Sequence, residues 1–559
     1  MLRSLNSKSS RALAGQISGD QEVKGILSCH RDHRLGAHVI HLTTLFSLMC
    51  CGTANLLSAQ SSPHAMSLPP SCVKLAAASR EASRLMQSAG SLPSATAYRS
   101  LGESFADINE FACSISAYEL ALKLEPHSWQ TRQSLGLTLI QTGDLSRAAN
   151  ELREVIRQQP GSHLAHNGLG LALEGLGELT SAREEFEAAV EISPRFALGY
   201  YNLAHVASAG NHFAAAVFYA EKAVSLDPRE PAFQLALGIA YSQNQNLQRS
   251  IEVLRKLIAS HPDLTEAYHN LGTAYAKEKD FDAAVRNYRQ ALKLDPGNLE
   301  TLLSLGIALV AKVQPIEAVP VLKDYVKSKP RDFQGYYWQG RAYKDLTQYQ
   351  EAADSLKQAS RLNPNDYEVC FNLGVVLAQL GKYAEGAEQL QRAKILNPQG
   401  TEVRYQLANV LRRLNDSTAA SEELKVFQAL KERDQQKARA VKYHNEGDAL
   451  LAKEQFGKAA EQYRQGLQLD PENPRLHYNL SLALKGLGNQ DEQKKELETA
   501  IHLDSNLAPA YYWLGQLYRA QGALTQAEQN LKAAIAIDPQ LAQAKESLAT
   551  LRQSRRADR

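Results

Sequence analysis

Residues 265–298 read TEAYHNLGTAYAKEKDFDAAVRNYRQALKLDPGN, two runs of helix-forming residues that end in a proline. The apolar and small residues recur at helical spacing, and they are Tyr268, Leu271, Gly272 and Tyr275 in the first run and Ala284, Tyr288 and Ala291 in the second. This spacing places each set on one face of a helix. Pro296 has no N–H with which to continue the second helix. The segment therefore predicts a helical hairpin.

The same pattern extends along the chain in both directions. Prolines stand at a constant interval of 34 residues, at Pro126, Pro160, Pro194, Pro228, Pro262, Pro296, Pro330, Pro364 and Pro398. The phase returns at Pro471 and Pro539, with Ser505 in place of the proline between them. A fixed period of this length indicates a repeat architecture. We predict thirteen helix-turn-helix units between Ala95 and Leu541.

Particular positions of the unit, counted from its first residue, explain how the two helices fit together. Position eight is glycine in most units, at Gly102, Gly136, Gly170, Gly238, Gly272, Gly306, Gly340, Gly374, Gly447 and Gly515, which lets the second helix come close. Large residues at positions four, seven, eleven and twenty-four are predicted to fill the core. Glycines between the helices, such as Gly143, suit a left-handed cap. Helices this short are unstable alone in water, so stacking of the units must stabilise them.

This pattern resembles the tetratricopeptide repeat family, whose units carry W-x-x-L-G-x-x-Y, then A-x-x-x-F and a final proline. The resemblance covers about four fifths of the chain. It implies an all-α fold, a right-handed superhelical solenoid of about thirteen repeats, with the first helix of each pair lining a concave groove. The array is also similar to the solenoid of protein O-linked N-acetylglucosamine transferases, but no transferase domain follows Leu541 in this sequence.

The chain divides into segments around this array. We predict an N-terminal extension at residues 1–60, a linker with a lead-in helix (Val73 to Gln87) at 61–94, repeats 1–10 at 95–434, an insertion at 435–439, repeats 11–13 at 440–541, and a capping helix with a tail at 542–559. Repeat ten has Glu432 in place of its terminal proline. The insertion therefore belongs to an extended helix that either links two blocks of repeats or bends near Asp434.

The N-terminal extension contains an apolar run. No Asp, Glu, Lys or Arg occurs between Arg34 and Lys74, and residues 39–57 are mostly apolar. The run predicts an export signal cleaved before Gln60, and hence a periplasmic or secreted protein, with the true start downstream of Met1. The alternatives are an uncleaved membrane anchor, in which case a membrane is also a partner, or a cytoplasmic protein.

Composition and motifs exclude several functions. Lys and Arg number 62 against 60 Asp and Glu, a net charge of +2, so there is no broad basic field for nucleic acid. The six cysteines form no C-x-x-C pair, which argues against a zinc site and a disulfide scaffold, and Cys113 and Cys370 are predicted to be buried free thiols. No phosphate-binding, hydrolase or zinc-protease motif occurs. We predict no enzyme activity, no metal and no cofactor.

The resemblance implies that positions two, five, six and nine of each first helix, with their neighbours, contact ligands. Asparagines at position six can hydrogen-bond an extended peptide, and aromatic residues at positions five and six are favoured anchors. The predicted site comprises Asn202, Asn270, Asn372, Asn445, Asn479, Tyr201, Tyr337, Trp338, Tyr405, Tyr478, Tyr512 and Trp513. Packing between repeats is the alternative role of these residues. The partners predicted are other proteins or peptide segments.

Two functions compete at this stage. The first is a non-catalytic scaffold or adaptor that holds protein segments in the groove. The second is an accessory subunit that presents substrates to a separate enzyme, such as a glycosyltransferase or an envelope-assembly complex. A stable enzyme partner would favour the second.

Overall fold

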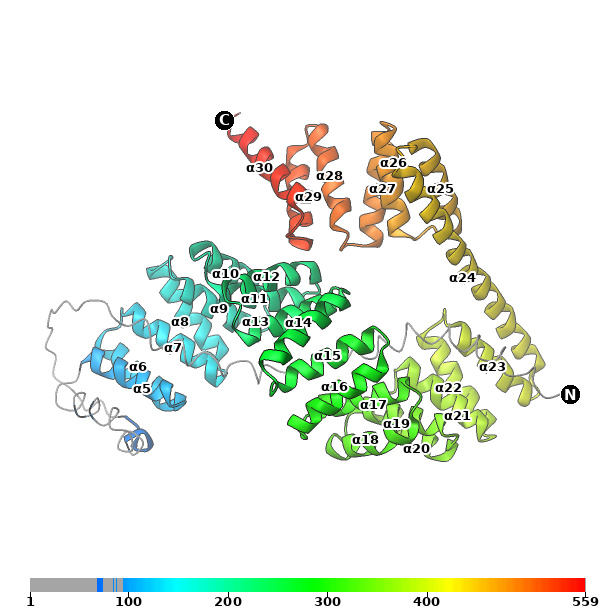
Figure 1. Cartoon of the computed structure of the whole chain (residues 1–559), viewed down its shortest axis with the longest axis horizontal. Coiled ribbons are helices and arrows are strands. Elements are labelled where there is room, and N and C mark those ends of the chain that lie inside the picture. Colours follow the sequence, from blue (N-terminus) through cyan, green and yellow to red (C-terminus); the bar gives the residue numbers. More distant parts are fainter. Residues whose placement is uncertain (1–67, 74–83, 85–86, 88–93, 558–559) are drawn as a thin grey trace. The chain divides into compact units, whose positions relative to one another are not determined.

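The computed structural model describes residues 68–73, 84, 87 and 94–557, and within them the regular elements are helices, with no strand (Figure 1). The helices follow one another as hairpins along the chain, which confirms the predicted all-α solenoid of tandem repeats. The N-terminal extension and most of the predicted lead-in helix lie outside the described residues, although residues 70–73 are helical.

Each repeat contributes two helices. The first helices are α5 (Ala95–Asp107), α7 (Trp129–Thr142), α9 (His163–Gly175), α11 (Ala197–Ala209), α13 (Pro231–Gln243), α15 (Thr265–Lys277), α17 (Leu299–Ala311), α19 (Phe333–Asp345), α21 (Tyr367–Gln379), α23 (Thr401–Arg413), α26 (Pro474–Gly486) and α28 (Ala508–Ala520). The second helices are α6 (Phe111–Leu124), α8 (Leu145–Gln158), α10 (Leu179–Ile192), α12 (Phe213–Leu226), α14 (Leu247–Ser260), α16 (Phe281–Leu294), α18 (Pro315–Ser328), α20 (Tyr349–Leu362), α22 (Tyr383–Leu396), α25 (Phe456–Leu469), α27 (Gln490–Leu503) and α29 (Leu524–Ile537). Two further helices, α24 (Ser417–Leu451) and α30 (Ala542–Ala557), complete the order.

Close approach of the two helices depends on position eight, as the sequence predicts. A Cβ atom added at Gly272 would lie 2.8 Å from ring carbons of Tyr288, which is 1% exposed. No side chain fits there without displacing the tyrosine. Gly272 therefore marks where α15 and α16 touch.

The turn between the two helices reverses the chain through one left-handed residue. Glycine takes this conformation at Gly143, Gly177, Gly381, Gly488 and Gly522. Non-glycine residues take it at the same offset in the other repeats, namely Asn109, Asn211, Gln245, Lys279, Val313, Thr347, Asn415 and Glu454. The sequence identifies only the glycines, whereas the structure shows that the turn is general.

The repeats stack through two kinds of contact. Each second helix packs on the next first helix, as α8 does on α9 and α18 on α19. Successive first helices also touch each other, as α7 and α9 or α17 and α19 do. The described repeats fall into two compact units, one up to Gln243 and one from Asn244 onward. First helices of neighbouring repeats are therefore in direct contact with each other.

Position four is filled by a buried residue in some repeats, as predicted, with Tyr98 and Cys370 as examples, but in four repeats it carries a polar side chain instead. In repeat twelve, His477 Nδ1 lies 2.5 Å from Glu496 Oε2 in the second helix, and His477 Nε2 lies 2.9 Å from the carbonyl oxygen of Pro471 in the preceding repeat. The same bridge is made by Arg132 to Glu151 and Pro126, by His166 to Glu185 and Pro160, and by Arg404 to Glu423 and Pro398. These polar side chains occupy position four because they satisfy the carbonyl that the terminal proline leaves exposed.

The tenth and eleventh repeats share one helix. α24 has 35 residues and continues through Asp434 and residues 435–439 without a break. Its N-terminal part contacts α23 and its C-terminal part contacts α25. Only Ala420, Ala440 and Gly447 of this helix are buried, so its middle part is largely exposed to solvent.

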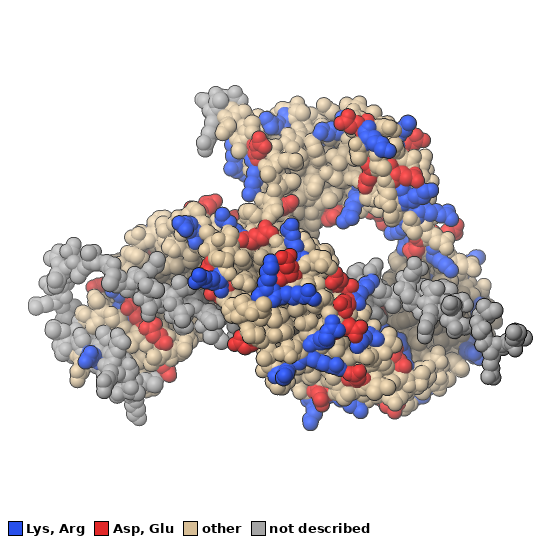
Figure 2. Space-filling model, viewed as in Figure 1, with Lys and Arg blue, Asp and Glu red and all other residues tan. Residues whose placement is uncertain are grey.

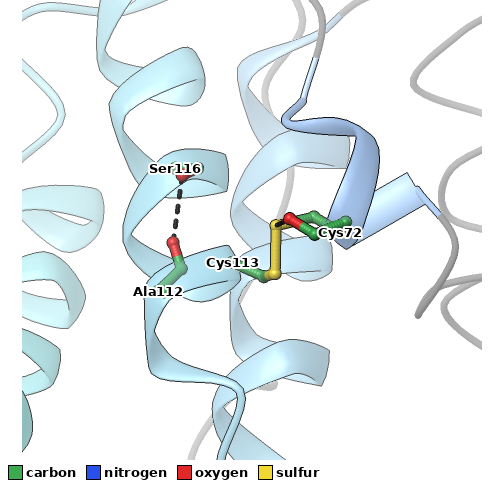
Figure 3. The surroundings of a disulfide bond; sticks show 5 residues. Cys72, Ala112, Cys113 and Ser116 are labelled. Atoms are coloured by element: carbon green, nitrogen blue, oxygen red, sulfur yellow. Dashed lines mark hydrogen bonds between the residues drawn. A yellow bond between two sulfur atoms is a disulfide. The ribbon is translucent and has the colours of Figure 1, made fainter.

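The cysteines correct a second prediction. Cys113 is not a free thiol, because it forms a disulfide with Cys72, across 41 residues of sequence (Figure 3). The disulfide ties the segment at residues 68–73 to α6, where Leu68 and Cys72 join the core of the first repeat. Cys370 is buried and free as predicted, and its thiol contacts the carbonyl oxygen of Pro364 at 3.6 Å.

Within the described residues, no helix has both the length and the apolar character that a bilayer crossing requires. The apolar run at residues 39–57 lies outside these residues. The described His, Cys, Asp and Glu side chains form no cluster that could hold a metal ion.

Candidate protein-binding face

The first helices present one common face, which we call the A face. It consists of positions 2, 5, 6, 9, 12 and 13 of each repeat, which helical periodicity brings to one side of the helix. Successive first helices touch each other from α5 to α13 and from α15 to α23, so these positions form a strip along each of these two runs. All twelve residues of the predicted site belong to the A face.

Four of the five predicted asparagines use their amides within the repeats, and three of these lie in repeats four, six and nine. Asn202 is buried and its Nδ2 donates to Asn167 Oδ1 at 2.8 Å. Asn372 is also buried, and its Nδ2 donates to the carbonyl oxygen of Glu368 at 2.9 Å. Asn270 Nδ2 donates to the carbonyl oxygen of Glu266, one turn earlier, at 2.8 Å. These amide groups tie helices together, or bond to their own helix.

The fourth of these asparagines, Asn479, lies in the twelfth repeat, and the fifth predicted asparagine, Asn445, lies in the eleventh. Asn479 Nδ2 lies 2.8 Å from Asp448 Oδ1 and 2.9 Å from His444 Nε2. Asn445 is exposed. The structure therefore does not bring the five asparagines together as a row of unoccupied amides.

The aromatic residues of repeat eight are covered. Tyr337 is 8% exposed and Trp338 is 4% exposed. Burial raises the pKa of Tyr337, and Arg341 Nη1 donates to its hydroxyl at 3.2 Å. The Arg341 guanidinium also lies 5.4 Å from the centre of the Trp338 ring. Both rings are part of the packing between repeats.

The aromatic residues of the last repeats are more accessible. The rings of Tyr512 and Trp513 meet edge to face with centroids 4.9 Å apart, and both side chains are only partly buried. The Lys485 ammonium, from the preceding first helix, lies 3.6 Å from the centre of the Trp513 ring. Burial raises the pKa of Tyr478, against a hydrogen bond from Trp513. These residues join α26 to α28.

Two predicted tyrosines lie elsewhere on the A face. Tyr405 in α23 is exposed at 42% and its ring centroid lies 5.5 Å from that of Phe427. Tyr201 in α11 is partly covered by Phe233, with 5.4 Å between the ring centroids. Burial raises the pKa of Tyr201.

Polar contacts between repeats, which the sequence reasoning missed, also occupy the A face. Lys344 Nζ donates to Asn372 Oδ1 at 2.7 Å, and the hydroxyl of Tyr337 lies 3.4 Å from Glu368 Oε2. Burial raises the pKa of Glu368, and this effect outweighs the opposing effect of the nearby Arg341. The repeat register could have indicated these contacts, because position 12 of one repeat lies next to position 6 of the following repeat, as Lys344 does to Asn372 and Lys485 to Trp513.

Tandem helical hairpins that leave one face of their first helices open define a helical-repeat solenoid. Models of the tetratricopeptide repeat match residues 134–195, 207–274, 265–298, 337–401, 447–488, 474–507 and 508–541. The chain belongs to the tetratricopeptide repeat family. Proteins of this family generally serve as non-catalytic scaffolds that bind other proteins or peptides.

Two curated relatives match short segments. The chain is 26% identical over 110 residues to Protein STIP1 homolog of Dictyostelium discoideum, which is 20% of each protein. It is 24% identical over 106 residues to Small glutamine-rich tetratricopeptide repeat-containing protein 2 of Mycosarcoma maydis, which is 19% of this chain and 30% of the relative. The chain thus spans less than a third of either relative.

Solved structures of other repeat proteins are similar in part. A tetratricopeptide repeat protein from Parabacteroides merdae is 15% identical with a TM-score of 0.37, over 45% of this chain and 99% of that one. The Cut9–Hcn1 hetero-tetramer of the APC/C gives 15% identity and a TM-score of 0.35, over 86% of this chain and 98% of that one. MamA gives 26% identity and a TM-score of 0.29, over 31% of this chain and 93% of that one.

Proposed function

We propose that this protein is a non-catalytic scaffold that holds segments of other proteins against its A face. The accessible aromatic residues of the later repeats carry this proposal. Tyr405, Tyr512 and Trp513 stand on the A face with part of each ring open to solvent. Aromatic side chains combine a large contact area with few rotatable bonds, so they lose little entropy when they bind a partner.

The polar contacts within the A face support this role. The bonds from Asn202 to Asn167 and from Lys344 to Asn372 fix neighbouring first helices at a set spacing. A surface that is already ordered loses little further entropy on binding. We therefore assign the buried asparagines to positioning the face and the open aromatics to contact.

We further propose that the protein works in an oxidising compartment, as expected of an exported protein. The Cys72–Cys113 disulfide supports this location, because disulfides persist outside the cytoplasm and are rare where thiols are kept reduced. Treatment of intact cells with a thiol-blocking reagent before lysis tests it. Cys72 and Cys113 should be recovered linked by mass spectrometry, and recovery of both as blocked thiols would contradict the location.

Site-specific photocrosslinking in the native cells tests the scaffold function. A photoreactive amino acid at Tyr405 or Tyr512 should give covalent adducts with the same set of proteins. The matched controls place it at Lys458 in α25 and Lys495 in α27, which are exposed on second helices. Equal adducts from the second helices, or none from the A face, would disprove the assignment.

A further inference from the structure

The second helix of repeat ten, which is the first part of α24, lacks the cover that the other second helices have. Position 24 of the repeat is at most 1% exposed in the other repeats, as at Tyr288 and Leu390. In repeat ten it is Leu424, which is only partly buried, and Phe427 is partly buried as well. At an ordinary junction the next first helix packs on this side of the second helix, as α17 does on α16. Because α24 continues as one helix, nothing described covers that side in repeat ten.

Repeat eleven of the same chain is not suited to supply this cover. Position three of a first helix packs against the preceding second helix, and a Cβ atom added at Gly335 would lie 2.6 Å from the ring of Tyr325. In repeat eleven this position is Lys442, whose side chain is 77% exposed and lies 3.7 Å from Glu446. A lysine loses its hydration when it enters an apolar junction, which is costly. The open side of Leu424 and Phe427 is therefore available to another molecule.

The open side continues along α24 with the spacing of a coiled coil. Residues at alternating steps of three and four share one side of a helix, which is the a and d pattern of two packed helices. We call the residues with this spacing the α24 seam, and they are Leu424, Phe427, Lys431, Asp434, Ala438 and Val441. The last four are exposed, and Val441 is 53% exposed. An apolar pair therefore stands at each end of the seam and a charged pair in its middle.

The α24 seam is complementary to itself when it is reversed. Its midpoint lies between residues 432 and 433, so two antiparallel copies that cross there bring equidistant positions together. The facing pairs are Leu424 with Val441, Phe427 with Ala438, and Lys431 with Asp434. Two of these pairs are apolar, with the large phenylalanine ring opposite a single methyl group, and the third joins opposite charges. The seam thus matches a second copy of itself in both size and charge.

The charged pair selects the antiparallel direction. Lys431 and Asp434 are exposed, and neither is among the described side chains of α24 that form ion pairs. Parallel helices would place each lysine against a lysine and each aspartate against an aspartate, and like charges in contact disfavour that arrangement. Antiparallel helices place each lysine against an aspartate of the other chain. A polar residue at an a position fixes register and orientation at a cost in stability.

We infer that two copies of this chain associate through an antiparallel coiled coil of their α24 helices, formed by the α24 seam. From Leu424 to Val441 the helix spans about 26 Å, so the contact is short and the dimer is reversible. The association goes beyond the scaffold function, which a single chain can perform. Two chains together carry two copies of the A face, and a partner with two matching segments gains from the high effective concentration of the second copy.

Sedimentation equilibrium of the full-length chain tests this inference. We expect the mass to rise with concentration from that of one chain to that of two. Lys431→Asp and Asp434→Lys each bring like charges together at the centre of the seam, so each should raise the dissociation constant of the dimer at least about ten-fold. Arg433→Asp is the matched control, because it reverses an exposed charge on the opposite side of the helix and should leave the dimer unchanged.

Exchange of the two charges identifies the pairing. The double variant Lys431→Asp with Asp434→Lys restores opposite charges between antiparallel chains, so its dissociation constant should return to within about three-fold of the original. A mixture of the two single variants should also form a dimer, because the lysines of one chain then face the aspartates of the other. Circular dichroism of each variant checks that the helix content is retained.

The outcomes decide between a second copy and no partner of this kind. A mass of one chain at every concentration would overturn the inference, and so would a dimer that Lys431→Asp leaves unchanged. Weak association of the double variant, with both single variants weakened, would overturn the antiparallel pairing. If a single variant loses helix content, the double variant still decides the question, since it has the same composition as the native chain.

Discussion

His477 Nδ1 lies 2.5 Å from Glu496 Oε2, so the first and second helices of repeat twelve are joined by a charge-assisted contact. Both side chains are largely buried, with 13% and 14% of their surface exposed. Burial disfavours the charged imidazole, but the hydrogen bonds to Glu496 and to the Pro471 carbonyl outweigh it and raise the pKa of His477. The protonated form is therefore more stable in the folded chain than in the unfolded one.

The raised pKa gives a pH-dependent prediction. A raised folded-state pKa contributes stability that is complete below about pH 6.5, the ordinary histidine pKa, and is lost as the pH rises through the folded value. His477→Gln should destabilise the last repeats by about 1–3 kcal/mol at pH 5.5 and by less at pH 8.5. Urea denaturation at the two pH values measures the difference. His502→Gln, at an exposed position of α27, is the control, and a loss that does not vary with pH would refute the assignment.

Val313 supplies a stabilising substitution. It takes a left-handed conformation with φ 61° in the turn between α17 and α18, and its side chain is 77% exposed. A β-branched residue is strained there, whereas glycine is not. Val313→Gly should raise the free energy of unfolding by about 0.5–1 kcal/mol, even though glycine makes the unfolded chain more flexible. The reverse change, Gly143→Val, should lower it. Thermal unfolding compares the three proteins, and a destabilised Val313→Gly variant would contradict the turn geometry.

The Cys72–Cys113 disulfide predicts how the N-terminal end responds to reduction. Cys72→Ser should destabilise the first repeat by about 2–4 kcal/mol, because the disulfide closes a loop of 41 residues in the unfolded chain. Hydrogen exchange of α5 and α6 measures the change. Cys113→Ser should have a similar effect, and the double variant little more, since both remove one bond. Faster exchange in Cys370→Ala at the same helices would instead indicate a general loss of packing.

The contact of Gly272 with Tyr288 predicts a sharp steric effect. Gly272→Ala places a methyl group about 2.8 Å from the tyrosine ring, so α15 and α16 must separate. We expect a loss of about 1–3 kcal/mol, despite the higher helix propensity of alanine. Gly161→Ala is the matched control, because nothing lies within 4 Å of a Cβ atom added there. Equal stability of the two variants, measured by urea denaturation, would show that the helices are not in contact at Gly272.

The repeat period and the helix pairs could be predicted from the sequence because two residue types mark them. The terminal proline ends each second helix, and the glycine at position eight lies where the two helices of a pair touch. Position four was harder to interpret, since Arg132 and His477 read as core fillers until their partners across the hairpin are known. The disulfide was missed because Cys72 lies outside the repeats and its distance to Cys113 depends on how the segment at 68–73 folds back.

The predicted site residues all hold positions five and six of their repeats, but the sequence could not tell which of these side chains are open to solvent. Tyr337 and Tyr512 hold the same position, yet the first is buried and the second is only partly buried. Exposure depends on what the next repeat places over each ring. Repeat eight is followed by a full hairpin with Glu368, whereas repeat thirteen is followed by α30 alone. The exposure of Tyr337 or Tyr512 therefore cannot be predicted from the sequence of its own repeat alone.

α24 has a mechanical consequence (Figure 1). At other junctions a turn lets two successive helices adjust to each other, but here 35 residues form one rod about 52 Å long. Each residue of a helix turns the chain by about 100°, so deleting one residue of the exposed middle would swing the last repeats around the axis of the rod. The number of residues in α24 therefore determines the rotation of the last repeats about the axis of this helix. Lysines, arginines and carboxylates are intermingled over the visible surface (Figure 2).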